Sequence, residues 1–182
     1  MVDKIPNKIP ATDVLKALEK EDYKTSIFVD KNEITNTFMT YKGRVVELNK
    51  IKVSILANKM TVKEAEEKIR TNIIGAAFMG EWLAFVLDKN PNFNINDFFK
   101  QFSFYSSEEK FFDSKAALTR DYYTKTHKLL KDDEDLDAMK NKGFWNPRDG
   151  FKILFISNAD DEDIETFKSN NSTFGYDFYY IK

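Results

Sequence analysis

The 182-residue chain has 42% hydrophobic and 32% charged residues, the composition of a globular protein, and we expect one domain over 1–182 with 1–10 as an extended or mobile tail. A formal net charge of −2 gives no general attraction to nucleic acid or to an anionic membrane. The absence of Cys and the presence of a single His exclude disulfides, thiol catalysis and a multi-histidine metal site within one chain.

The first ten residues, MVDKIPNKIP, lack the apolar core of a signal peptide, so we expect a cytoplasmic location and no membrane association. The glycines are scattered singly and form no phosphate-binding loop, and we expect no cofactor. An aromatic content of 15% favours an aromatic contact surface in addition to an aromatic core.

The N-terminal part of the chain predicts a small antiparallel sheet. A short helix over about residues 13–22 precedes an apolar strand at 26–30. β-branched and aromatic residues at 34–41 and 44–49 flank Gly43, and this pattern predicts a β-hairpin that turns at the glycine.

Residues 50–60 fit either a fourth strand or a short helix. As a helix, they give with the following segment the outline of a helix-turn-helix. The second helix of that motif would carry Glu64, Glu66 and Glu67 toward DNA phosphates, so a plain connector is the favoured interpretation.

The longest predicted helix covers residues 61–88 and organises the rest of the expected fold. Thr61 and Glu64 have the spacing of a capping box, which marks the start of the helix. Between residues 73 and 87 the only charged side chain is Glu81, so the second half of this helix should be buried.

The C-terminal half predicts two helices followed by a βαβ unit. The expected elements are a helix at about 95–105, a helix at about 107–131 opened by a Ser106–Glu109 capping box, a strand at 151–157, a short helix to about Lys168 and a strand at 176–181. The expected fold class is therefore α+β, with an N-terminal antiparallel hairpin or sheet, the buried helix 61–88, and a C-terminal β-α-β unit whose strands are parallel.

Glu81 is a candidate general acid or base because a buried carboxylate either finds a partner or acquires a raised pKa. The alternative is that Glu81 lies on a narrow exposed strip beside cations or pairs with one buried Lys or Arg.

Asp160, Asp161 and Asp163 follow directly after the predicted strand at 151–157. Carboxylates beyond the carboxyl end of a strand are candidate Mg²⁺ ligands. The same residues would also stabilise the first turn of a helix through its dipole, and this interpretation requires no metal.

One face of the helix predicted at 107–131 carries cations and an aromatic ring. Its members are Arg120, Tyr123, His127 and Lys131, with Lys125 and Lys128 nearby, and such a face suits a nucleic-acid backbone with a stacked base. The segment from Arg120 through Asp121 to His127 resembles the R-x(4–6)-H element of HEPN-type ribonucleases over eight residues. The resemblance implies RNA cleavage by Arg120 and His127 in an all-helical bundle; an exposed His without catalytic role is the alternative.

Phe144, Trp145 and Arg148 lie in a loop that Pro147 stiffens, and they are candidate protein-binding residues because Trp and Arg dominate interface hot spots. The alternative is that Phe144 and Trp145 close the end of the core.

The function that these features favour is a non-enzymatic protein-interaction module with another protein as its partner. A phage- or plasmid-borne accessory or inhibitor of a host nucleic-acid enzyme, such as a CRISPR effector, fits the size and acidity of the chain. The alternative is a nucleic-acid-binding protein or a small nuclease that uses the basic face at 120–131.

Overall fold

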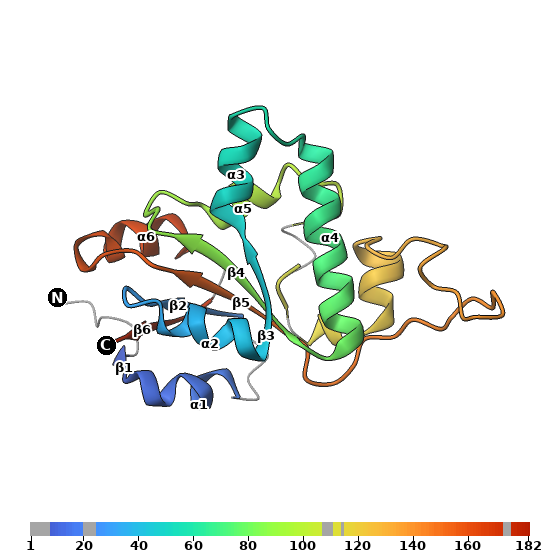
Figure 1. Cartoon of the computed structure of the whole chain (residues 1–182), viewed down its shortest axis with the longest axis horizontal. Coiled ribbons are helices and arrows are strands. Elements are labelled where there is room, and N and C mark those ends of the chain that lie inside the picture. The colour runs from blue at the N-terminus through green and yellow to red at the C-terminus, as the bar shows by residue number, and fades with distance from the viewer. Residues whose placement is uncertain (1–7, 20–24, 107–110, 114, 173–175) are drawn as a thin grey trace.

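The computed structural model of the chain describes residues 8–19, 25–106, 111–113, 115–172 and 176–182. These residues form an α/β fold in which one parallel sheet lies between two layers of helices (Figure 1). The two ends of the described chain meet at one edge of the sheet, where β1 (Lys8–Ile9) pairs with β6 (Asp177–Ile181). Residues 1–7 of the expected tail lie outside the described ranges.

All six strands of the sheet are parallel and follow the order β1-β6-β2-β5-β4-β3. The strands β2 (Ser26–Val29), β5 (Lys152–Ser157) and β4 (Trp82–Asp88) lie in the interior of the sheet, and β3 (Gly43–Glu47) forms the edge opposite β1. The predicted α+β class with an N-terminal antiparallel hairpin is therefore wrong. The two C-terminal strands β5 and β6 run parallel, but β2 lies between them in the sheet.

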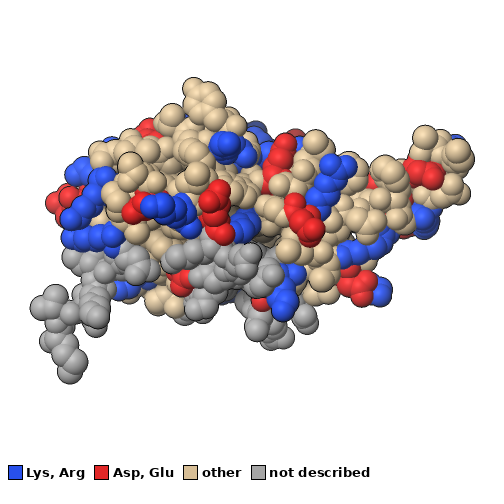
Figure 2. All heavy atoms as spheres, turned by 90° about the horizontal axis from the view of Figure 1, so that it is seen from below, with Lys and Arg blue, Asp and Glu red and all other residues tan. Residues whose placement is uncertain are grey.

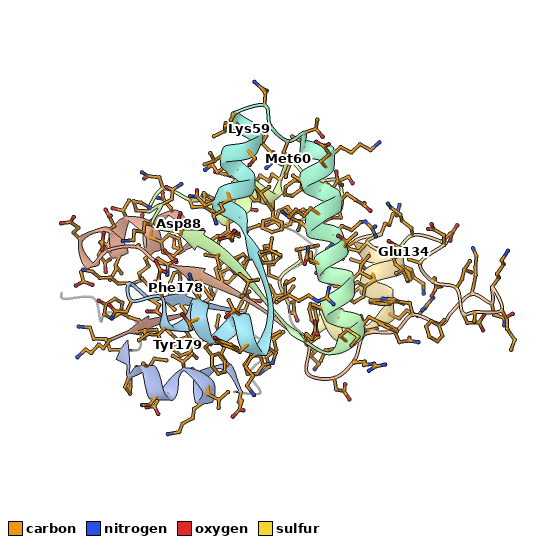
Figure 3. The ribbon with its side chains drawn as sticks, in the orientation of Figure 1. Lys59, Met60, Asp88, Glu134, Phe178 and Tyr179 are labelled. Carbon is orange, nitrogen blue, oxygen red and sulfur yellow. The ribbon has the colours of Figure 1, made fainter. Side chains whose placement is uncertain are left out.

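Helices connect the strands. They are α1 (Val14–Leu18), α2 (Ile34–Lys42), α3 (Leu48–Leu56), α4 (Val62–Met79), α5 (Ile95–Phe99) and α6 (Ile164–Asn170). The helices α3 and α4 form a hairpin that rises from the sheet, and Lys59 and Met60 mark its tip (Figure 3). No helix of the described ranges is both long and apolar enough to span a membrane.

Each face of the sheet has its own apolar core. In β4, Leu83, Phe85 and Leu87 join the core that contains α3, α4, α5 and α6, whereas Ala84 and Val86 join the core that contains α1 and α2. Successive side chains of a strand point to opposite faces, so a strand covered on both faces consists of apolar residues without interruption.

Residues 34–41, expected as the first strand of the hairpin, form the helix α2. The fully buried side chains of α2 are Thr35 and Met39, which are four residues apart and so lie on one helix face. β3 therefore pairs with β4 instead of the segment that precedes it. Packing against the sheet outweighs the β propensity of this Thr-rich segment.

The helix predicted at 61–88 begins at the expected residue but ends early. The capping box is confirmed, because the Glu64 N–H donates to Thr61 Oγ1 (3.2 Å) and the Thr61 N–H donates to Glu64 Oε2 (2.8 Å). The helix α4 stops at Met79 because Gly80 adopts a left-handed conformation with a φ of 70°. Residues 73–79 of the predicted apolar half remain in α4, and its last residues, 82–88, form the strand β4.

The helix predicted at 107–131 is not continuous in the described residues, which contain a 3₁₀ turn at Ala116–Leu118 and a π-helical turn at Tyr122–Thr126. Part of its expected capping box, Glu109, lies outside the described ranges. The helix predicted at 95–105 is limited to the five residues of α5.

Beyond the π-helical turn, residues 131–144 form an arm that projects away from the sheet beside α4 (Figure 1). A single antiparallel bridge joins Leu136 to Lys142, and the Asp137 carboxylate accepts the N–H groups of Met139 and Asn141, both at 2.8 Å. These bonds fold the tip of the arm, where 83% of Met139 is exposed.

Candidate functional site at the carboxyl edge of the sheet

The strand order places a topological switch point between β2 and β5. The connection after β2 runs through α2 toward β3 and packs on one face of the sheet. The connection after β5 runs through α6 toward β6, in the opposite direction and on the other face. In parallel α/β sheets, ligands bind outside the carboxyl ends of the strands at such a point.

Asn158, the residue after β5, joins three elements at this edge. Its Nδ2 donates to the carbonyl oxygen of Asp30, which follows β2, at 2.8 Å. Its backbone N–H donates to the Asp88 carbonyl oxygen at the end of β4 at 2.9 Å, and its Oδ1 accepts from Asn36 Nδ2 at 3.1 Å. Because Asn158 is only 2% exposed, its hydrogen bonds hold the ends of β2, β4 and β5 and the start of α2 in one arrangement.

The buried Asp30 organises the start of α2. Its two carboxylate oxygens accept the backbone N–H groups of Asn32 (3.1 Å) and Thr35 (2.5 Å). The side-chain oxygens Oγ1 of Thr35 and Oδ1 of Asn36 are also buried, and neither has a hydrogen-bond partner among the described residues. A buried polar atom without a partner is uncommon in folded proteins, so these two oxygens distinguish this edge of the sheet.

A pocket of about 190 Å³ opens at this edge, and we call it the carboxyl-edge pocket. Its lining comes from the β2–α2 loop, the starts of α2 and α3, and the ends of β3, β4 and β5. The lining residues are Glu33, Asn36, Glu47, Asn49, Lys50, Val86, Asp88 and Asn158. Figure 3 shows Asp88 at the carboxyl end of β4. A larger hollow of about 310 Å³ lies between α3 and α5, away from the switch point, and it includes the exposed Leu56.

Two acidic residues of the carboxyl-edge pocket have strained backbones. Glu33 and Asp88 both have a φ of 59°, in the left-handed region that residues other than Gly, Asn, Asp and His rarely adopt, so Glu33 is the more strained of the two. The ladder between β4 and β5 also shifts its register between Val86 and Asp88. Backbone strain of this kind is concentrated at functional sites, where the surrounding structure maintains it.

The predicted metal ligands lie beside this edge of the sheet. Lys31 Nζ lies 3.6 Å from Asp160 Oδ1 and 4.0 Å from Asp161 Oδ2. The Tyr180 hydroxyl donates to Asp161, and this hydrogen bond raises the pKa of Tyr180 to about 12. Asp163 follows in a 3₁₀ turn before α6. Across the described residues, no group of three or more His, Asp or Glu side chains is placed to hold a metal ion.

The residues predicted to form a basic helix face do not share one surface. Arg120 donates to the Trp145 carbonyl oxygen and pairs with Asp135. Tyr123 and His127 are 0% and 3% exposed, and the His127 ring contacts Phe111 and lies with Nδ1 3.1 Å from the Phe104 carbonyl oxygen.

The three predicted lysines lie at the surface. Lys125 pairs with Asp121 at 2.9 Å, Lys131 pairs with Glu67 at 2.9 Å, and Lys128 is exposed. On the side of the molecule where α1 lies, the basic and acidic side chains of the described residues are interspersed (Figure 2). The local field of such a surface is weak because opposite charges are close together.

Glu81 follows Gly80 at the turn into β4, and its side chain is 37% exposed. Its Oε2 accepts from Arg44 Nε at 2.6 Å. The Glu81 carboxylate therefore has a cationic partner, but Arg44 is 36% exposed instead of buried, and the pair lies away from the carboxyl edge.

The predicted protein-binding residues divide between core and surface. Trp145 is 4% exposed, and its ring lies 4.5 Å from Tyr123, so this side chain belongs to the core. Phe144 is 57% exposed at the base of the arm, and the guanidinium of Arg148 lies 5.3 Å from the Phe78 ring.

The residues of the carboxyl-edge pocket were not among those predicted, although the sequence contains a signal for them. Three apolar runs end in a polar residue: SIFV before Asp30, WLAFVL before Asp88 and KILFIS before Asn158. Parallel strands carry their carboxyl ends to one edge, so three such endings would have indicated a common site. This inference requires a parallel sheet, and the predicted antiparallel hairpin excluded it.

No protein-family model, curated protein or solved structure matches the chain. The fold and the site therefore define a class only: an α/β protein with a parallel sheet and a polar pocket at its switch point.

Proposed function

We propose that this protein binds a small polar molecule in the carboxyl-edge pocket. The observation that carries the proposal is the convergence of polar side chains from the ends of β3, β4 and β5 and from the starts of α2 and α3 on one pocket at the switch point. The buried, unpartnered Asn36 Oδ1 gives separate support, since a ligand donor would satisfy it. A volume of about 190 Å³ is below the range of roughly 300–1,000 Å³ of drug-sized sites, so the ligand is small.

A screen of polar metabolites by amide chemical-shift changes tests this proposal. Ligands should shift the amides of Asn36, Asn49, Asp88 and Asn158 in the wild-type protein. Asn49→Phe places a ring in the pocket and should abolish these shifts. Asn72→Phe makes the same change on α4, outside the pocket, and should leave them unchanged. Shifts that survive Asn49→Phe, or that occur only at other amides, would contradict the proposal.

Protein binding through the arm at residues 131–144 is a second candidate function. The arm projects from the body and exposes Met139 at its tip and Phe144 at its base. An exposed flexible Met side chain adapts to irregular apolar surfaces, which suits a binding loop. This candidate preserves the prediction of a protein-interaction module, with Phe144 in place of the buried Trp145 as its aromatic contact.

Cross-linking in a native lysate, followed by affinity purification, distinguishes this second candidate. Met139→Glu should remove the cross-linked partner, because it places a charge at the centre of the contact. Tyr41→Glu changes a side chain that is 84% exposed on α2 and should retain the partner. Equal recovery with both variants would exclude the arm as the contact.

A further inference from the structure

The carboxyl-edge pocket is acidic. Its lining includes the carboxylates of Glu33, Glu47 and Asp88 and the ammonium of Lys50, so three negative charges and one positive charge leave a formal charge of −2. Lys50 Nζ already lies 2.6 Å from Glu47 Oε1. The one cation of the lining therefore has its counter-ion within the pocket, and the charges that remain for a ligand are negative.

The start of α2 does not provide the anion site that helices offer in many parallel α/β proteins. Free N–H groups at a helix N-terminus bind phosphate in those proteins. Here the buried Asp30 carboxylate accepts the N–H groups of Asn32 and Thr35, so it already supplies the negative charge that the helix end favours. A phosphate in the pocket would approach the carboxylates of Glu33 and Asp88.

The neutral groups of the pocket also present an acceptor. Asn158 Nδ2 donates to the Asp30 carbonyl oxygen, which fixes Asn158 Oδ1 as an acceptor toward Asn36. Asn36 must therefore direct Nδ2 at Asn158, at 3.1 Å, and its buried Oδ1 is left to accept from another group. A bound molecule that donates hydrogen bonds completes this arrangement, and one that only accepts them does not.

We infer that the carboxyl-edge pocket recognises a small organic ammonium ion with a second N–H or O–H donor, such as a diamine or an amino alcohol. This inference rests on the proposed function. Asp88 and Glu33 provide the ionic partners, and Asp88 Oδ2 also accepts from Asn49 Nδ2 at 3.4 Å. Asn36 Oδ1 is covered in this structure, so it accepts the further donor only when the ligand displaces the groups that cover it. Charge-assisted hydrogen bonds are the strongest available to such a ligand, and they discriminate against neutral and anionic molecules of the same size.

Titration calorimetry with 1,4-diaminobutane, glycerol and inorganic phosphate as probes, together with amide shifts, tests the ligand class. The diamine should bind, and more weakly at higher salt because ionic attraction is screened. Asp88→Asn should weaken diamine binding about tenfold, since a bond to a charged group is replaced by a neutral one. Asn tolerates the φ of 59° at this position, so this variant retains the backbone. Glu33→Gln should have a similar effect, whereas Glu165→Gln, an exposed residue on α6, should have none.

The possible results separate the two proposals. If phosphate or glycerol shifts the pocket amides and the diamine does not, the pocket is a ligand site but the ligand class is wrong. If the diamine binds equally to the wild type, Asp88→Asn and Glu33→Gln, its binding is not at the inferred carboxylates and the inference is overturned. If none of the three probes shifts a pocket amide, the inference also fails, and the metabolite screen then decides the proposed function separately.

Discussion

Arg70 is a buried charged side chain that links the body of the protein to the arm at residues 131–144. It lies on α4 with 5% exposure and donates to both oxygens of Glu67, to both oxygens of Glu134 and to the Leu129 carbonyl oxygen. Burial by itself would raise the pKa of Glu134, but the hydrogen bonds from Arg70 and from the Lys131 N–H together lower it. The guanidinium thus holds one carboxylate from its own helix and one from the arm.

Arg70→Met should destabilise the fold by about 2–4 kcal/mol, because it leaves Glu134 and the Leu129 carbonyl without their donor. Urea unfolding measures this change. Lys63→Met removes an exposed cation from the first turn of the same helix and should change the free energy of unfolding by less than about 0.5 kcal/mol. Equal effects of the two substitutions would show that the Arg70 bonds contribute nothing specific.

Glu67 makes stability depend on acid pH. Hydrogen bonds from Arg70 and then from Lys131 lower its pKa from 4.5 to about 2. A carboxyl whose folded pKa lies below its unfolded pKa stabilises the fold above the unfolded value, and this contribution is lost as pH falls through the folded value. The free energy of unfolding should therefore decline between about pH 4.5 and pH 2, and more steeply in the wild type than in Glu67→Gln. Unfolding curves at several pH values check this, and parallel declines in both proteins would be inconsistent with it.

At the scale of elements, the start of α4 was predictable but its end was not. The capping box of Thr61 and Glu64 depends on residues three apart, so the sequence alone specifies it. The apolar run at residues 82–87 has neither helical nor alternating periodicity, because β4 is buried on both faces. Gly80 was the local signal for the boundary, and its left-handed conformation ends the helix.

The identity of α2 could not be obtained from local preference. Thr and aromatic residues at 34–41 favour a strand that would pair with β3. In the structure β3 pairs with β4, which comes later in the chain, and this pairing cannot be recognised from residues 34–49 alone. The same limit applies to the candidate site. Asp30, Asp88 and Asn158 are separated by as many as 128 residues and meet only once the strand order is known.

Two glycines offer a matched test of the packing between β3, β4 and α4. A Cβ at Gly43 would collide with the Trp82 carbonyl oxygen of the paired strand, which is backbone and cannot move aside. Gly43→Ala should therefore cost about 2 kcal/mol in the free energy of unfolding. A Cβ at Gly75 would meet only the end of the Arg44 side chain, which can move away. Gly75→Ala should be neutral or stabilising, since Ala is favoured over Gly in a helix by about 1 kcal/mol.

Thermal or urea unfolding of both Gly variants provides the comparison. A larger loss in the free energy of unfolding for Gly75→Ala than for Gly43→Ala would mean that the Arg44–Glu81 pair contributes more to stability than the close packing of β3 against β4.

At the scale of the whole molecule, one aromatic cluster joins the sheet to the helices and loops on the α4 side. The Phe99 ring lies at its centre, with centroid distances of 4.9 to 6.0 Å to the rings of Phe85, Phe98, Phe102, Tyr105, Phe111 and Phe112. These rings come from β4, from α5 and from the segments that follow α5. The high Phe content of the sequence is thus largely used in one core, although the sequence alone also allowed an exposed aromatic surface.

Phe99→Ala should lower the free energy of unfolding by about 3–5 kcal/mol, because it leaves a cavity among rings that cannot all move together. Phe144→Ala removes the same ring from a site that is 57% exposed and should cost less than about 1 kcal/mol. Urea unfolding of the two variants measures the difference. Similar losses would indicate that the Phe99 pocket collapses, or that Phe144 packs more tightly than its exposure suggests.

The place of β2 in the sheet has a consequence for how the chain reaches its fold. β2 forms its ladders only with β5 and β6, which begin more than 120 residues later in the chain. Pairing over such separations requires closure of long loops before any hydrogen bond compensates, and it slows folding. During synthesis, residues 26–29 leave the ribosome early. This largely apolar segment stays unpaired until residues 152–181 have been synthesised. The pairing of β2 with β5 brings Asn158 to Asp30, so the carboxyl-edge pocket is complete only when β2 has paired with β5.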